Sequence, residues 1–298
     1  MTPQGTPFDP TRVPHLGGRF APVTEEADAT ELRITGTLPD SLDGVYLRNG
    51  PNPRFTPVGS YPYPIDGDGM IHGLWLSQGR ARYRNRFVRT PRHARRGAGR
   101  TRPLGRPPVP DHPRRRPGGE ALAGSFKYVQ WPALSLGHGP EPAPAGPGAH
   151  SGLTRALVDP ATGTVRRTQL DDTRVELPRI DDRSNHRLAT AAGSGRTPGL
   201  ITGEYDALCW YDIEGDRATS TLWPAGDLSV GEPVFAPTPG TRDAADGHWL
   251  TFATDRTDDT SWLLVLPGDD PAQGPVARVR IPVRVPLGLH GTWLPTEE

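Results

Sequence analysis

The chain has 298 residues, of which 34% are hydrophobic, with 36 glycines and 36 prolines. This composition disfavours a helical bundle and favours short strands joined by many turns, or a fold that carries a disordered stretch. Lysine plus arginine equals aspartate plus glutamate at 34 each, so the net charge indicates no nucleic-acid partner, and one cysteine excludes an internal disulfide and a cysteine-rich zinc site.

The N-terminal stretch "MTPQGTPFDPTRVP" has no apolar core after a basic start, and no window of the chain reaches membrane-spanning length. We therefore expect a soluble, cytoplasmic protein.

The first part of the chain, residues 1–90, reads as β structure. Two short β-branched or aromatic runs lie on either side of a turn in "ELRITGTLPDSLDGVYLRNG". Further on, Met70–Leu76 and Arg82–Thr90 flank "SQG", which predicts a hairpin. The word "DGDGMIH" lacks the acidic spacing of a calcium loop, so we interpret it as a tight turn into a strand and give His72 no metal role.

Residues 91–150 differ from the rest of the chain. They contain 12 prolines, 10 glycines and 9 arginines, and ten basic residues against three acidic ones give a local charge of +7. Such a segment cannot bury enough apolar surface to offset its ordering entropy, so we predict a mostly disordered insert. Its histidines (His93, His112, His138 and His150) are interpreted as exposed, and with few interleaved aromatics its arginines are not interpreted as a nucleic-acid site.

The last part, residues 151–298, again reads as strands joined by turns. The words "LTRALVDPATGTVRRTQL" and "DALCWYDIEGDRATSTLW" each predict a hairpin, and two further strand words follow after residue 246. No stretch shows sustained helical periodicity, so the fold class is all-β, with meandering antiparallel sheets as in a sandwich or a propeller. Cys209 lies on an apolar face and is interpreted as a buried structural thiol.

Several of these words resemble the carotenoid cleavage oxygenase family, which includes lignostilbene dioxygenases. On the N-terminal side they are "GVYLRNGPNP", "DGDGMIHGLWL" and "ARYRNRFVRT"; on the C-terminal side they are "VELPRIDDR", "YDALCWYD", "GEPVFAP" and "VPLGLHGTW". Order and spacing agree within each half. The resemblance covers about residues 30–90 and 152–293, which is two-thirds of the chain.

The resemblance implies a seven-bladed β-propeller whose axis carries a non-haem Fe(II) held by four histidines. The iron activates O2 to cleave a C=C bond in an apolar polyene or stilbene, and family members often contact membranes peripherally. His290 matches the last of the four ligands, with Leu289 in place of the usual phenylalanine. Glu176 and Glu232 match two outer glutamates, which would fix the tautomer of a ligating imidazole and increase its basicity.

The sequence also departs from the family. The words that carry the other three histidine ligands and the third outer glutamate are absent, and residues 91–150 are too short to replace the missing middle blades. We therefore expect an incomplete propeller in which one imidazole cannot hold Fe(II), and a chain that is inactive or severely impaired. The alternatives are a non-catalytic propeller remnant or pseudogene product, and a segment 91–150 that is partly translated out of frame.

Overall fold

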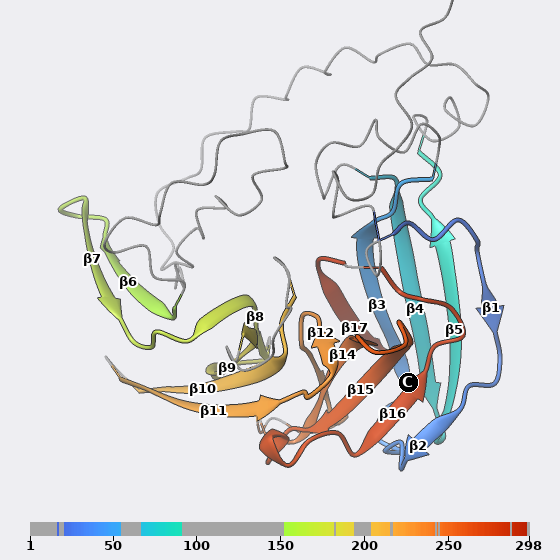
Figure 1. Ribbon diagram of the computed structural model, residues 1–298. Helices are drawn as coiled ribbons and strands as arrows, with labels where there is room; N and C mark the ends of the chain where they lie inside the picture. Colours follow the sequence, from blue (N-terminus) through green and yellow to red (C-terminus); the bar gives the residue numbers. More distant parts are fainter. Residues whose placement is uncertain are drawn as a thin grey trace, which may run out of the picture.

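The computed structural model describes residues 17, 21–54, 67–90, 152–181, 183–193, 204–214, 217–241, 243, 245–286 and 288–296, and Figure 1 shows their arrangement. The predicted insert at 91–150 lies outside the described residues. Within them the chain is built from strands and one short 3-10 helix, η4 (Pro271–Gln273), which confirms the all-β prediction. No helix in this part of the chain has the length and apolar character of a transmembrane segment.

The first sheet, called here the N-terminal sheet, has five strands in the order β1-β5-β4-β3-β17. Its central strands alternate buried and more exposed residues, because successive side chains of a strand point to opposite faces. The strands are β1 (Asp28–Ala29), β3 (Gly44–Pro51), β4 (Gly69–Ser77), β5 (Arg80–Phe87) and β17 (Gly291–Pro295). The predicted hairpin is thus confirmed as β4–β5, although β5 ends at Phe87 and not at Thr90.

The second sheet, called the C-terminal sheet, follows the order β12-β14-β15-β16-β2, and β13 also pairs with β14. Both faces of its central strands are buried, which explains the nearly continuous apolar word "WLLVL" in β15. The strands are β2 (Ile34–Gly36), β12 (Leu228–Val230), β13 (Val234–Pro237), β14 (Gly247–Asp255), β15 (Ser261–Pro267) and β16 (Ala277–Arg280).

The third sheet, called the β8–β11 sheet, has the order β11-β10-β9-β8, and a separate hairpin precedes it in the sequence. Both hairpins predicted from their turn words are present. The strands of the hairpin are β6 (Thr154–Asp159) and β7 (Thr164–Gln169); those of the sheet are β8 (Arg174–Asp181), β9 (Ser184–Gly193), β10 (Ala207–Glu214) and β11 (Arg217–Pro224).

The three sheets pack face to face, with the C-terminal sheet in the middle (Figure 1). Leu250 and Phe252 of β14 join a core shared with Tyr46 and Leu74 of the N-terminal sheet. Their neighbour Trp249 points to the opposite face and joins Trp210 of β10 in a second core. Sheets stacked in this way are the arrangement of propeller blades, as the sequence predicted.

A third core lies on the far face of the β8–β11 sheet, where Cys209 and Tyr211 pack with Leu153 and Leu188. Cys209 is only 1% exposed and burial raises the pKa of its thiol to about 11. The prediction that Cys209 is buried is therefore confirmed.

Each end of the described chain contributes a strand to the sheet that is built mainly from the other end. β2, from the N-terminal part, pairs with β16, whereas β17, from the C-terminal part, pairs with β3. Strand pairing thus joins the predicted portions 1–90 and 151–298. This exchange also places His290, which directly precedes β17, beside the N-terminal sheet.

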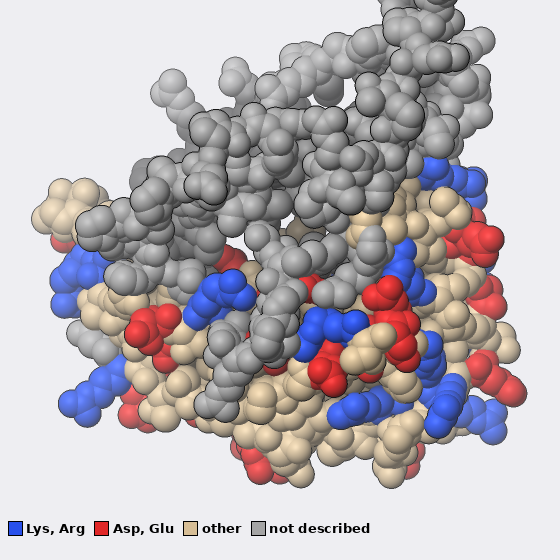
Figure 2. All heavy atoms as spheres, viewed as in Figure 1, with Lys and Arg blue, Asp and Glu red and all other residues tan. Residues whose placement is uncertain are grey.

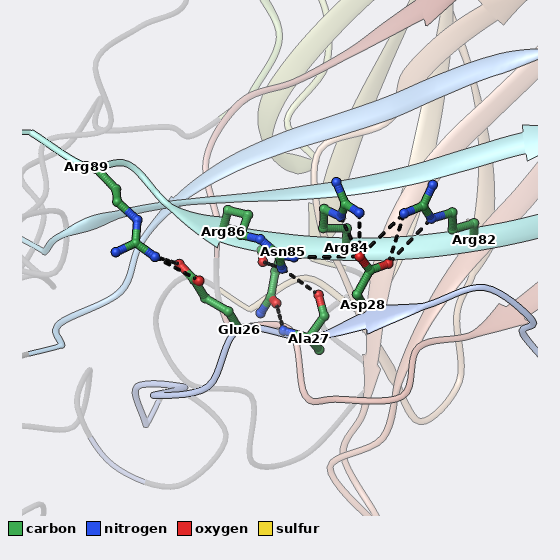
Figure 3. A network of polar contacts seen from close by, with 8 residues as sticks. All are labelled: Glu26, Ala27, Asp28, Arg82, Arg84, Asn85, Arg86 and Arg89. Carbon is green, nitrogen blue, oxygen red and sulfur yellow. Dashed lines mark hydrogen bonds and ion pairs between the residues drawn. The ribbon is translucent and has the colours of Figure 1, made fainter.

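Charged side chains of both signs are interspersed over the part of the surface that is described, as Figure 2 shows for one face. Beside edge strand β1 several of these charges form ion pairs. There Arg82, Arg84 and Arg86 of β5 converge on the single carboxylate of Asp28, and Arg89 pairs with Glu26 (Figure 3).

Candidate metal-ligand corner

His290 lies where the chain enters β17, and its backbone is fixed by β3. The amide of Asn49 donates to the carbonyl of His290 at 3.0 Å, and the amide of Leu289 donates to the carbonyl of Asn49 at 3.0 Å. The His290 side chain, by contrast, is 75% exposed. The ladder therefore positions the backbone of His290 while its imidazole remains accessible.

Glu232 lies in the short segment between β12 and β13, and its side chain is only 1% exposed. Its Oε1 atom is 2.8 Å from Nδ1 of His290, and its Oε2 atom accepts the amide hydrogen of Gly291 at 2.7 Å. When Glu232 is ionised its carboxylate only accepts hydrogen bonds, and Nδ1 of His290 then carries the hydrogen. The lone pair of Nε2 is then the one available for a metal ion or a proton.

Glu176 lies apart from this pair, on β8. Its carboxyl group is half-buried, and burial raises its pKa above the ordinary value of 4.5. The polar contacts of the described residues join Glu232, and not Glu176, to His290. The structure thus brings together two of the three residues singled out from the sequence.

Arg179 is a functional candidate that the sequence analysis missed. Its Nη1 atom donates to the carbonyl of Gly291 at 2.9 Å and lies 3.6 Å from Oε2 of Glu232. The word "VELPRIDDR" contains this arginine. Nothing in its local pattern separates it from the other arginines of the chain, because the contact depends on strands far apart in the sequence.

The other histidines with described side chains lie elsewhere. His72 of β4 is 1% exposed, and its Nδ1 atom is 2.7 Å from the hydroxyl of Tyr83. Burial and the nearby Arg48 guanidinium hold the pKa of His72 well below its ordinary range. His248 of β14 pairs with the last residue of β15, Pro267.

The described residues do not provide the ligand set that the family resemblance implies for Fe(II). Among them, no group of three or more His, Cys, Asp or Glu side chains is arranged to hold a metal ion. The corner offers one accessible imidazole nitrogen. Fe(II) sites of this kind need several nitrogen or oxygen ligands that converge, so the described residues alone do not fit the metal.

The family model described as retinal pigment epithelial membrane protein matches residues 20–130 and 125–295. The chain therefore belongs to that family, the carotenoid cleavage oxygenases.

Curated relatives match over short stretches. The chain is 51% identical over 82 residues to carotenoid 9,10(9',10')-cleavage dioxygenase 1 of Phaseolus vulgaris, which covers 27% of this chain and 15% of the relative. It is 52% identical over 79 residues to a carotenoid cleavage oxygenase of Mycobacterium tuberculosis, which covers 26% and 16% respectively. The matched part thus spans about one-sixth of the length of these relatives.

Solved structures show the same fold. The lignostilbene dioxygenase of Pseudomonas brassicacearum superimposes with a TM-score of 0.68 at 18% identity, over 95% of this chain and 98% of that chain. A variant of the Synechocystis apocarotenoid oxygenase gives 0.67 at 14% identity, over 92% and 97%.

Proposed function

We propose that this chain derives from an Fe(II)- and O2-dependent oxygenase that cleaves a C=C bond of a carotenoid, apocarotenoid or stilbene. Support comes from family membership and from the names of its relatives, which include carotenoid cleavage dioxygenases and a lignostilbene dioxygenase. His290 is the proposed surviving iron ligand, and Glu232 its outer partner.

The observation that carries this proposal is the bond between Nδ1 of His290 and Glu232. A histidine that ligates a metal through one ring nitrogen commonly donates the other N–H to a carboxylate, which fixes the tautomer and orients the ring. Here a carboxylate with 1% exposure does so for an imidazole that is 75% exposed. We propose that Glu176 is likewise an inherited outer glutamate, but one whose histidine partner belonged to the sequence words that this chain lacks.

We further propose that the chain by itself does not carry out the cleavage. The reaction in a complete family member depends on iron, which supplies the O2 chemistry. The described residues contribute one imidazole towards it, with Glu232 to hold that imidazole. The second candidate function is accordingly a non-catalytic propeller remnant, favoured by the same shortage of ligands.

The proposal includes a cytoplasmic protein that contacts membranes peripherally, because an apolar polyene partitions into the bilayer. Cell fractionation tests this part.

A product assay tests the catalytic part. The purified full chain is incubated with Fe(II), O2 and ascorbate, once with an apocarotenoid and once with a hydroxystilbene, and aldehyde products are measured by mass spectrometry. We expect no aldehyde above the level formed with the His290→Ala variant. Aldehyde that depends on both iron and His290 would overturn the proposed loss of activity and confirm the substrate class.

A further inference from the structure

Glu232 is a buried carboxylate that contacts a cation as well as two hydrogen-bond donors. The Arg179 guanidinium lies 3.6 Å from its Oε2 atom, and the same Nη1 atom donates to the carbonyl of Gly291 at 2.9 Å. Arg179 therefore contacts both the carboxylate that holds His290 and the residue that follows His290 in the chain.

An irregularity in β8 accompanies this placement. Glu176 pairs with Ala191 and Arg179 with Ala189, so three steps along β8 match two steps along β9. The extra residue makes a β-bulge, and Leu177 adopts a left-handed backbone with φ of 53° there. A bulge changes the face to which later side chains point. We infer that it aims Arg179 towards the start of β17.

The contact between Arg179 and Glu232 matters because Glu232 is a buried acidic group. A carboxylate that is removed from water needs a compensating charge and a full set of hydrogen bonds. The amide of Gly291 and Nδ1 of His290 supply the hydrogen bonds. Arg179 supplies an adjacent positive charge, in addition to the buried Arg48 guanidinium, which also interacts with Glu232, and its bond to the Gly291 carbonyl links β8 to β17.

We propose that Arg179 is a positioning residue that holds the Glu232 carboxylate in place and thereby keeps His290 in the tautomer with hydrogen on Nδ1. In a free neutral histidine the hydrogen prefers Nε2, so the tautomer reports directly on the Glu232 contact. The inference deepens the proposed function, since it concerns the same histidine, but it requires neither bound iron nor turnover.

The test is nitrogen-15 NMR of the histidine rings in the full chain at about pH 8.5, where an ordinary imidazole is neutral. The His290 signals are assigned by their loss in a His290→Gln variant. In the wild type we expect mostly the Nδ1–H tautomer. In Arg179→Gln, which removes the charge and shortens the side chain, we expect at least a threefold rise in the Nε2–H to Nδ1–H ratio.

Two further variants sharpen the result. Arg179→Lys keeps the charge without the planar fork, and we expect an intermediate ratio. Arg183→Gln is the matched control, because Arg183 pairs with Asp181 at 3.0 Å on the same stretch of chain; its ratio should equal that of the wild type.

A ratio in Arg179→Gln equal to that of the wild type would overturn the proposal. If that variant does not fold, Arg179→Lys decides: a raised ratio supports the proposal, and a ratio equal to that of the wild type, or a dominant Nε2–H tautomer in the wild type itself, overturns it. Iron binding and product formation are measured separately, so failure of this inference is distinguishable from failure of the proposed function.

Discussion

Nδ1 of His290 lies 2.8 Å from Oε1 of Glu232, although 58 residues separate them in the chain. The contact exists because the chain leaves the C-terminal sheet after β16 and β17 then pairs with β3 in the N-terminal sheet. The amide of Gly291, the first residue of β17, donates to the other oxygen of the same carboxylate. Glu232 thus contacts both the first residue of β17 and the candidate ligand His290. Substitutions of Glu232 and of His290 should therefore have different effects on stability.

Glu232→Gln should lower the free energy of unfolding by about 2–3 kcal/mol, because it leaves Arg179 without its anion and weakens hydrogen bonds to a charged acceptor. His290→Ala should cost less than about 1 kcal/mol, since most of that side chain is already in water. Urea unfolding measures both. Glu214→Gln, at the exposed end of β10, serves as the control. Equal losses for the Glu232 and His290 variants would contradict the structural role of Glu232.

The carboxyl group of Glu176 should make the stability of the fold depend on pH. Burial raises the pKa of its carboxyl group above 4.5, so the folded state disfavours the charged form. The destabilising effect of ionising Glu176 is absent at a pH well below its ordinary pKa of 4.5, and it grows as the pH rises through the folded pKa. Glu176→Gln should therefore match the wild type at about pH 3 and be more stable than the wild type at about pH 7. A variant that is less stable only at neutral pH would contradict this.

We expect ion pairs between β1 and β5 to stabilise the pairing of edge strand β1. Hydrogen bonds from Arg84 and Arg82 hold the pKa of Asp28 below its ordinary value of 3.8. Stabilisation by a carboxylate with a depressed pKa is present above the ordinary value and is lost as pH falls through the folded pKa. Asp28→Asn should increase hydrogen exchange of the β1–β5 amides near neutral pH, and salt should do the same to the wild type (Figure 3).

The control for this experiment is Asp159→Asn, whose carboxylate accepts bonds within the β6–β7 turn. It should leave the exchange of β1 unchanged. Unaltered exchange in Asp28→Asn as well would show that backbone pairing alone holds the edge strand.

Gly36 should be essential for the pairing of β2 with β16. Its φ of +84° is unfavourable for other residues, and a Cβ atom there would collide with the carbonyl oxygen of Val276. We expect Gly36→Ala to lower the free energy of unfolding by at least about 2 kcal/mol. Gly226→Ala is the matched control, since Gly226 has a φ of +63° with nothing within 4 Å, and it should cost about 1 kcal/mol. Similar losses for the two variants would mean that the collision is relieved without harm.

The sequence predicts the local hairpins well, because turn words such as "DPATG" and "DIEGD" separate strands that pair with their immediate neighbours. It places the end of β5 too late, since the amide of Thr90 bonds back to the carbonyl of Val88 and leaves the ladder. The pairing of β2 with β16 and of β17 with β3 is not encoded in any local pattern.

In the candidate site, too, local patterns were predictable and long-range contacts were not. His290 and Glu232 could be selected only through the family words around them, and their contact depends on the exchange of β17. Arg179 could not be selected, because its aim depends on the bulge at Leu177, whose left-handed backbone is unusual for a leucine. Sequence patterns identify the strands, and long-range pairing determines which side chains meet.

The central claim is that this chain retains one corner of an iron centre and not the whole. The most direct test is the iron content of the purified full chain after anaerobic loading with Fe(II) and desalting, alongside a His290→Ala variant and a variant with His93, His112, His138 and His150 all changed to alanine. We predict well under one iron per chain in all three. One iron per chain in the wild type, lost in both variants, would show that the histidines of residues 91–150 complete the site and would contradict the account.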